Sequence, residues 1–196
     1  MSVYQFTPCV DLATREQTFA TWHNGFSDEE IQRIINTCEK LEKISGTIGG
    51  QKEEEDISNI RKSEISWVKL NNETGWLYER MAWIAKQLNG QFFEFDLYGF
   101  VEDFQYTVYY PNGSHYTWHM DKGFSSKGDS PRKLSIVLQL SDPAEYEGGD
   151  LELFTEAQST IITKEKGQVV AFPSWIIHRV TPVTKGIRRT LVLFPC

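Results

Sequence analysis

Apolar residues recur at a helical period in the first half of the chain. They lie three or four positions apart over about 28–43 and again over about 72–90, which predicts two amphipathic helices. Ser27 and Glu30 form the pattern of a capping box at the start of the first helix, and Asn72 is expected to cap the second. Each helix would contribute one apolar face to a core.

Outside these two helices, and mostly after the second one, apolar residues recur at every second position. Alternate residues of a strand point to the same face, so short alternating segments predict strands. The predicted strands are 65–70, 93–97, 104–110, 115–121, 132–140, 150–154, 158–163, 167–172, 175–181 and 187–195. Helices followed by many short strands favour an α+β fold whose second part is an antiparallel sandwich or barrel, such as a double-stranded β-helix, or jelly roll.

Length and composition narrow this picture. We expect a single domain over residues 1–196, with helical support over about 1–90 and the jelly-roll core over about 91–196. An aromatic content of 13% fits a β-rich core. A formal net charge of −7 makes nucleic acid an unlikely partner, because a general nucleic-acid binder normally carries a basic surface.

The cysteines and apolar runs of the chain bear on its compartment, and its glycines and acidic residues indicate a loop. Its three cysteines form no metal-binding pair and are odd in number, which predicts free thiols in a reducing compartment. The start lacks a secretory pattern and no apolar run approaches the ~20 residues that span a bilayer, so we expect a cytoplasmic protein without membrane contact. Residues 45–63 contain glycines and an acidic run, and predict a loop that is either a solvated connector or a lid over a site.

The candidate chemistry begins with a histidine and an aspartate two positions apart. His119 and Asp121 would present an imidazole and a carboxylate on one face of a strand. A second imidazole from a neighbouring strand would complete a facial triad of two histidines and one carboxylate, which suits non-haem Fe(II), and His178 is the candidate. An isolated histidine–aspartate pair also fits a structural histidine. The interpretation as a metal site therefore depends on other functional residues elsewhere in the chain.

An arginine on the last predicted strand accompanies the triad. Arg188 presents a fixed fork of donors that matches a carboxylate, and would anchor a dicarboxylate cosubstrate from inside the barrel. Thr190 shares its strand face, whereas Arg189 belongs to the other face. A slip of one residue in register would exchange the two arginines.

Several motifs in order resemble the iron(II)/2-oxoglutarate-dependent dioxygenases, in particular the prolyl 4-hydroxylase-like branch. The resemblance covers roughly 104–195, about half of the chain. The matching segments are 110–116, 119–121, 132–140, 146–153, 172–183 and 186–188.

The resemblance implies that His119, Asp121 and His178 bind Fe(II). It also implies an oxygenase that takes 2-oxoglutarate and O2 as cosubstrates, decarboxylates 2-oxoglutarate to succinate and hydroxylates an unactivated C–H bond. Ascorbate is expected to stimulate such an enzyme.

The resemblance likewise implies the residues around the cosubstrate. Arg188 would pair with the C5 carboxylate of 2-oxoglutarate, with Thr190 beside it, and Tyr110 would donate a hydrogen bond to the cosubstrate. The alternative for Tyr110 is a tyrosine packed at the barrel mouth. Gln139 stands where some relatives have a tyrosine that touches the cosubstrate, so this contact is expected to be lost or altered.

The substrate is the least determined part. The resemblance favours a prolyl residue in a peptide or protein. Two alternatives stay open: the same chemistry on a free amino acid, another small molecule or a nucleobase, and a non-catalytic jelly-roll binding module. The sequence predicts no oligomeric state.

Overall fold

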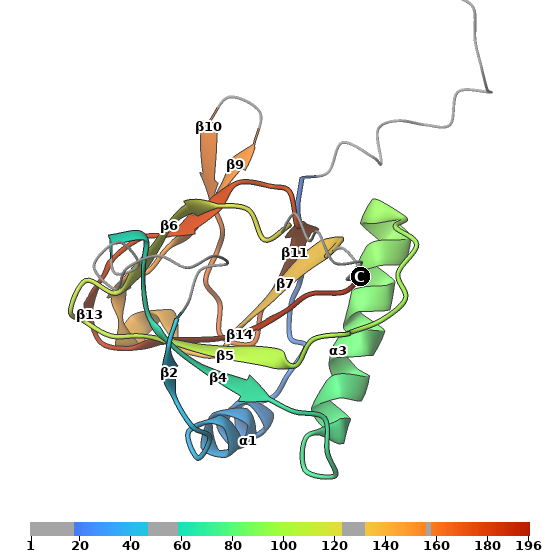
Figure 1. Cartoon of the computed structure of the whole chain (residues 1–196), viewed down its shortest axis with the longest axis horizontal. Coiled ribbons are helices and arrows are strands. Elements are labelled where there is room, and N and C mark those ends of the chain that lie inside the picture. The colour runs from blue at the N-terminus through green and yellow to red at the C-terminus, as the bar shows by residue number, and fades with distance from the viewer. Residues whose placement is uncertain (1–17, 47–58, 123–131, 156–157) are drawn as a thin grey trace, which may run out of the picture.

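The strands of the computed structural model, which describes residues 18–46, 59–122, 132–155 and 158–196, form two antiparallel sheets (Figure 1). The larger sheet has the order β1-β11-β7-β14-β5-β4-β2 and the smaller one the order β10-β9-β12-β6-β3. The larger comprises β1 (Ala20–Trp22), β2 (Ile44–Ser45), β4 (Glu64–Val68), β5 (Phe104–Tyr109), β7 (Leu134–Gln139), β11 (Val169–Pro173) and β14 (Arg188–Leu193). The smaller comprises β3 (Arg61–Lys62), β6 (His115–His119), β9 (Leu151–Thr155), β10 (Gln158–Ile161) and β12 (His178–Val180). A short ribbon pairs β8 (Glu147–Gly148) with β13 (Val183–Lys185).

Two α-helices support this core, and both are close to their predicted positions. They are α1 (Asp28–Cys38) and α3 (Gly75–Leu88), followed by the π-helical turn η2 (Asn89–Phe93), while a 3-10 turn, η3 (Pro143–Glu145), precedes β8. The capping box at α1 is confirmed: the backbone N–H of Glu30 donates to Ser27 Oγ, and that of Ser27 donates to a Glu30 carboxylate oxygen. At α3 the predicted cap is wrong: the N-cap is Thr74, without a capping bond from its side chain, and Asn71 accepts the backbone N–H groups of Glu73 and Thr74 in the turn before the helix.

The faces of the larger sheet are buried by different neighbours. Its outer face packs on the helices: Leu191 and Leu193 of β14 belong to a cluster that also contains Ile34 of α1 and Met81 of α3. Its inner face turns toward the smaller sheet, and apolar residues of both sheets form a second cluster there. Figure 1 shows α1 and α3 flanking the larger sheet, so the predicted α+β class with a double-stranded β-helix core is confirmed.

One predicted strand is wrong. Residues 93–97 leave η2 through Glu94, which has a left-handed backbone (φ 54°), and do not pair with a sheet. The Asn89 side chain accounts for this: its amide nitrogen donates to the carbonyl of Phe95, and its amide oxygen accepts the N–H of the same residue. Because Asn89 satisfies these backbone groups locally, the alternation of aromatic and acidic residues needs no partner strand.

The first ninety residues supply strands as well as helices, since β1, β2, β3 and β4 all lie there. The division into a helical part and a core at residue 90 stays a prediction. Of the predicted loop 45–63, positions 47–58 lie outside the described residues. Within the ranges that the structure describes, none of the helices combines the length and the apolar character needed to cross a bilayer.

Candidate metal and cosubstrate site

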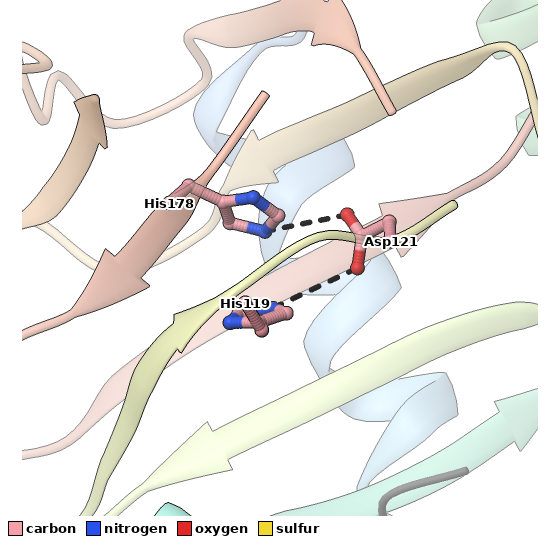
Figure 2. A group of neighbouring side chains, drawn as sticks. All are labelled: His119, Asp121 and His178. Carbon is pink, nitrogen blue, oxygen red and sulfur yellow. Dashed lines mark ion pairs between the residues drawn. The ribbon is translucent and has the colours of Figure 1, made fainter. Parts of the chain in front are cut away.

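Three side chains converge between β6 and β12 of the smaller sheet. His119 ends β6 and His178 begins β12, and the antiparallel register sets these two residues opposite each other. Asp121 lies just beyond the end of β6. His178 Nε2 is 3.3 Å from Asp121 Oδ2, and His119 Nε2 is 3.7 Å from Asp121 Oδ1. Figure 2 shows the three groups pointing toward one another, and one potential ligand atom from each falls within 4.8 Å of the others.

Backbone carbonyls orient both imidazoles. His119 Nδ1 lies 2.7 Å from the carbonyl oxygen of Thr117, and His178 Nδ1 lies 2.9 Å from that of Ile176. A carbonyl only accepts, so each ring donates from Nδ1 and directs its Nε2 toward Asp121. The Ser135 hydroxyl donates to Asp121 Oδ2 at 2.7 Å and fixes the carboxylate in turn. This is the outer support that metal-binding histidines and carboxylates characteristically have.

Burial and mutual charge set the protonation of the three groups. Burial and the neighbouring His178 lower the pKa of His119 to about 4, so this imidazole is neutral near pH 7. Burial opposes the charged carboxylate of Asp121, but His178, His119 and the Ser135 hydroxyl together hold its pKa below the usual range. Burial likewise opposes the charged form of His178, yet the Asp121 carboxylate raises its pKa. A metal ion would take the place of the proton shared by this pair.

Aromatic rings form the walls of the site. The Tyr116 ring stacks on the His119 ring with a centroid distance of 3.4 Å, and the Arg61 guanidinium lies 4.6 Å above the Tyr116 ring. Phe172 presents its edge to His178 at 4.8 Å. These contacts leave both imidazoles little freedom to turn.

A buried cation lines a cavity between the sheets. Arg188 is 3% exposed, and its Nε has no hydrogen-bond partner. Among the residues that the structure describes, no carboxylate forms an ion pair with it. The cavity is lined by Val137, Gln139, Leu151, Ile162, Thr163, Lys164, Gln168, Val170 and Arg188.

Gly149 makes room for the Arg188 stem. Its backbone is left-handed (φ 62°), and a Cβ there would come within 2.8 Å of the Arg188 Cδ. Any other residue would both strain this turn and displace the arginine.

The register of β14 separates the two arginines. Arg188 pairs with Tyr109 of β5 and faces the smaller sheet, and Thr190, 1% exposed, follows on the same side. Arg189 faces the helices, where its Nε donates to Glu39 Oε1 at 3.1 Å. The structure therefore directs Arg188, and not Arg189, into the barrel.

The Tyr110 side chain lies on the helix side of the larger sheet, away from Arg188. Its hydroxyl donates to Glu64 Oε2 at 2.7 Å, and its ring packs against the helix-side apolar cluster. Tyr109 points inward instead, with its ring centroid 5.4 Å from the Arg188 guanidinium carbon. The signal that distinguishes the two tyrosines is strand alternation: Tyr109 shares its face with Gln105 and Thr107, whereas Phe104, Tyr106 and Val108 pack toward the helices.

Known sequences are similar to the part of the chain that contains these residues. Residues 104–194 match the family model described as the 2OG-Fe(II) oxygenase superfamily. A PKHD-type hydroxylase of Synechococcus is 42% identical over 77 residues, which are 39% of this chain and 34% of that protein. A PKHD-type hydroxylase of Hyphomonas neptunium is 40% identical over 82 residues, 41% of this chain and 37% of that protein. The chain thus spans about a third of the length of these curated relatives.

Solved structures agree on the fold over nearly the whole chain. A prolyl-4-hydroxylase of Pseudomonas putida superposes with a TM-score of 0.74 at 21% identity, covering 94% of this chain and 95% of that one. A prolyl hydroxylase of Trichoplax adhaerens, solved with a peptide fragment of the hypoxia-inducible factor oxygen degradation domain, gives a TM-score of 0.74 at 18% identity, covering 94% and 84%. At these identities the likeness establishes the architecture.

Proposed function

We propose that the chain is a hydroxylase of the 2OG-Fe(II) oxygenase superfamily, whose family model matches residues 104–194, and that His119, Asp121 and His178 hold Fe(II). The observation that carries this proposal is the donor set: two imidazole nitrogens and one carboxylate converge, each already oriented by a hydrogen bond. Such a triad suits Fe(II) and leaves coordination positions open for cosubstrate and O2.

The second part of the proposal concerns 2-oxoglutarate. A buried guanidinium without a carboxylate partner is costly unless a ligand completes it. Arg188 is in this position and would pair with the C5 carboxylate of 2-oxoglutarate, with Thr190 on the same strand face. We assign the neighbouring tyrosine to Tyr109 rather than Tyr110, because the Tyr110 hydroxyl already donates to Glu64.

The chain's own contribution is orientation and shielding. When bound, iron and 2-oxoglutarate supply an oxidation in which O2 and 2-oxoglutarate give succinate, CO2 and one oxygen atom inserted into a C–H bond. Ser135 holds the Asp121 carboxylate at a fixed angle, and the Thr117 carbonyl holds the His119 ring. Phe172 and Tyr116 exclude water from the two imidazoles. Arg188 fixes the far end of the cosubstrate, so that its keto acid end meets the metal.

For the substrate we propose a prolyl residue in a peptide or protein. The support is the likeness to proteins named as prolyl hydroxylases, one of them solved with a peptide. A free amino acid, another small molecule or a nucleobase is the second candidate for the same chemistry. We also propose that ascorbate stimulates turnover by restoring Fe(II), and that the enzyme works in the cytoplasm.

Anaerobic addition of Fe(II) and 2-oxoglutarate tests the proposal directly. We expect a weak visible charge-transfer band, and in air the formation of succinate. Proline-containing peptides should gain one oxygen by mass spectrometry, while matched peptides with alanine in place of proline should not. A preparation that gives neither band nor succinate would speak for a non-catalytic binding module. A band with oxygen gain only on amino acids or nucleobases would overturn the peptide assignment.

A further inference from the structure

The cavity beside Arg188 contains a second cation, which belongs to no motif that the sequence suggested. Lys164 comes from the connection between β10 and β11 and lines the cavity with Arg188. Its Nζ donates to Asp150 Oδ1 at 2.8 Å and to the carbonyl oxygen of Gly148 at 3.0 Å. It lies 4.9 Å from the centroid of the Tyr146 ring. The ammonium is therefore held at the cavity wall by three neighbours.

One of the two amides that line the cavity, that of Gln139, cannot donate to an anion. Gln139 Nε2 donates one hydrogen to the carbonyl of Ser141 and the other to the Tyr146 hydroxyl, each at 3.0 Å. A carbonyl oxygen must face a donor, so this orientation of the amide is fixed. Gln139 therefore presents its oxygen, which repels a carboxylate.

Of the cavity's polar side chains on the β10–β11 side, which are Thr163, Lys164 and Gln168, only Lys164 carries a charge. Thr163 Oγ1 accepts a hydrogen from Gln168 Nε2 at 2.7 Å. An ammonium group carries three hydrogens, and the two bonds of Lys164 to Asp150 and Gly148 leave one. Lys164 thus combines a positive charge with an uncommitted donor at this wall.

We propose that Lys164 is a second cationic donor to the C5 carboxylate of 2-oxoglutarate, opposite Arg188. This assignment rests on the proposed function. Asp150 balances the Lys164 charge when no cosubstrate is bound, and keeps the ammonium in place for it. Two cations around one carboxylate also set specificity: a 2-oxo acid that ends in a methyl group gains from neither.

Titration of the anaerobic Fe(II) protein tests Lys164 through binding, without turnover. We expect Lys164→Gln to weaken 2-oxoglutarate binding about tenfold, as read from the charge-transfer band, because a hydrogen bond to a charged group is lost. Binding of 2-oxopentanoate, which has the same chain length without the distal carboxylate, should not change. Lys166→Gln is the matched control: Lys166 lies two positions on and pairs with Asp28, away from the cavity.

Two further variants separate a donor from a merely structural lysine. Lys164→Arg keeps the charge and should retain most of the affinity. Asp150→Asn removes the ion pair but leaves the ammonium, so the affinity should stay the same or rise. If Asp150→Asn weakens the binding of 2-oxoglutarate as much as Lys164→Gln does, Lys164 acts only through the turn that it stabilises.

Failure of this proposal differs from failure of the proposed function. A wild-type protein without a charge-transfer band would refute the oxygenase assignment itself. A normal band with equal affinities for wild type, Lys164→Gln and Lys166→Gln would refute the Lys164 assignment alone. Thermal unfolding of each variant shows whether a loss of affinity comes from a loss of fold, and Lys164→Arg gives the answer where Lys164→Gln does not fold.

Discussion

Two adjacent arginines on β14 have opposite surroundings. Arg189 faces the helices and is satisfied within the chain, because its Nε donates to Glu39 at the end of α1. Arg188 faces the smaller sheet, is almost fully buried, and has no carboxylate partner in the described part of the chain. The same side chain is paired within the chain on one face of the strand and, under the proposed function, binds the cosubstrate on the other. Strand alternation, and not residue type, decides between the two roles.

The contrast extends to the whole larger sheet. On its helix side the charged group of Arg189 and the Tyr106 hydroxyl are both paired with Glu39, and the neutral Ser66 hydroxyl is the buried group there that lacks a partner among the described residues. On its inner side lie Ser135, which supports Asp121, and Arg188, which no carboxylate among the described residues completes. Stability is therefore expected to depend mainly on the outer face and ligand binding on the inner one. Four substitutions test this division.

The largest expected effect is at the metal site. Asp121→Ala should abolish Fe(II) binding and with it all turnover, because two imidazoles without the carboxylate do not make the triad. The fold should survive, since the helix-side core is untouched. Metal content after reconstitution and thermal unfolding of the metal-free protein measure the two effects. Asp142→Ala, at the surface beside η3, is the control and should bind iron normally. Full iron loading of Asp121→Ala would rule out this carboxylate as a ligand.

A smaller effect is expected at the two arginines. Arg188→Ala should raise the Kd for 2-oxoglutarate about a hundredfold, because a buried charged pair is lost. It should not destabilise the ligand-free protein in proportion, since the charge removed there is unpaired. Arg189→Ala should leave the Kd within about twofold and lower stability slightly through the lost contact with Glu39.

Charge-transfer titration gives the Kd for 2-oxoglutarate of each variant, and urea unfolding gives its free energy of unfolding. These four values make the comparison. If Arg189→Ala carries the large change in Kd, the two faces of β14 are assigned the wrong way round.

The sequence could predict the features that depend on local period. Alternation sufficed to set His119 beside Asp121 and to put Arg188 and Thr190 on one face. It did not separate Tyr110 from Tyr109: the Tyr110 ring lies on the helix side and its hydroxyl donates to Glu64, whereas Tyr109 faces Arg188. Lys164 lies on the connection between β10 and β11, and it reaches the cavity of Arg188 only because β11 and β14 both pair with β7. Such contacts are a product of topology, which no local pattern encodes.

The smallest effect is a pH dependence on the helix side. Partial burial opposes the charged form of Glu39, but hydrogen bonds from Lys43, Tyr106 and Arg189 lower its pKa to about 2. The glutamate carboxyl of an unfolded chain has a pKa of about 4.3. The contribution of Glu39 to stability is therefore fully present above about pH 4.5, and is lost as the pH falls toward 2.

Glu39→Gln should accordingly lower the free energy of unfolding by about 1 kcal/mol at pH 7, a modest value because a third of this side chain is exposed to solvent. The difference between wild type and variant should shrink as the pH is lowered from 4.5 to 2.5 in urea unfolding experiments. Glu42→Gln, at an exposed position three residues on, is the control. Binding of 2-oxoglutarate should not change in either variant. A change in Kd on Glu39→Gln would mean that the outer face of β14 reaches the cosubstrate after all, and would break the division between the two faces.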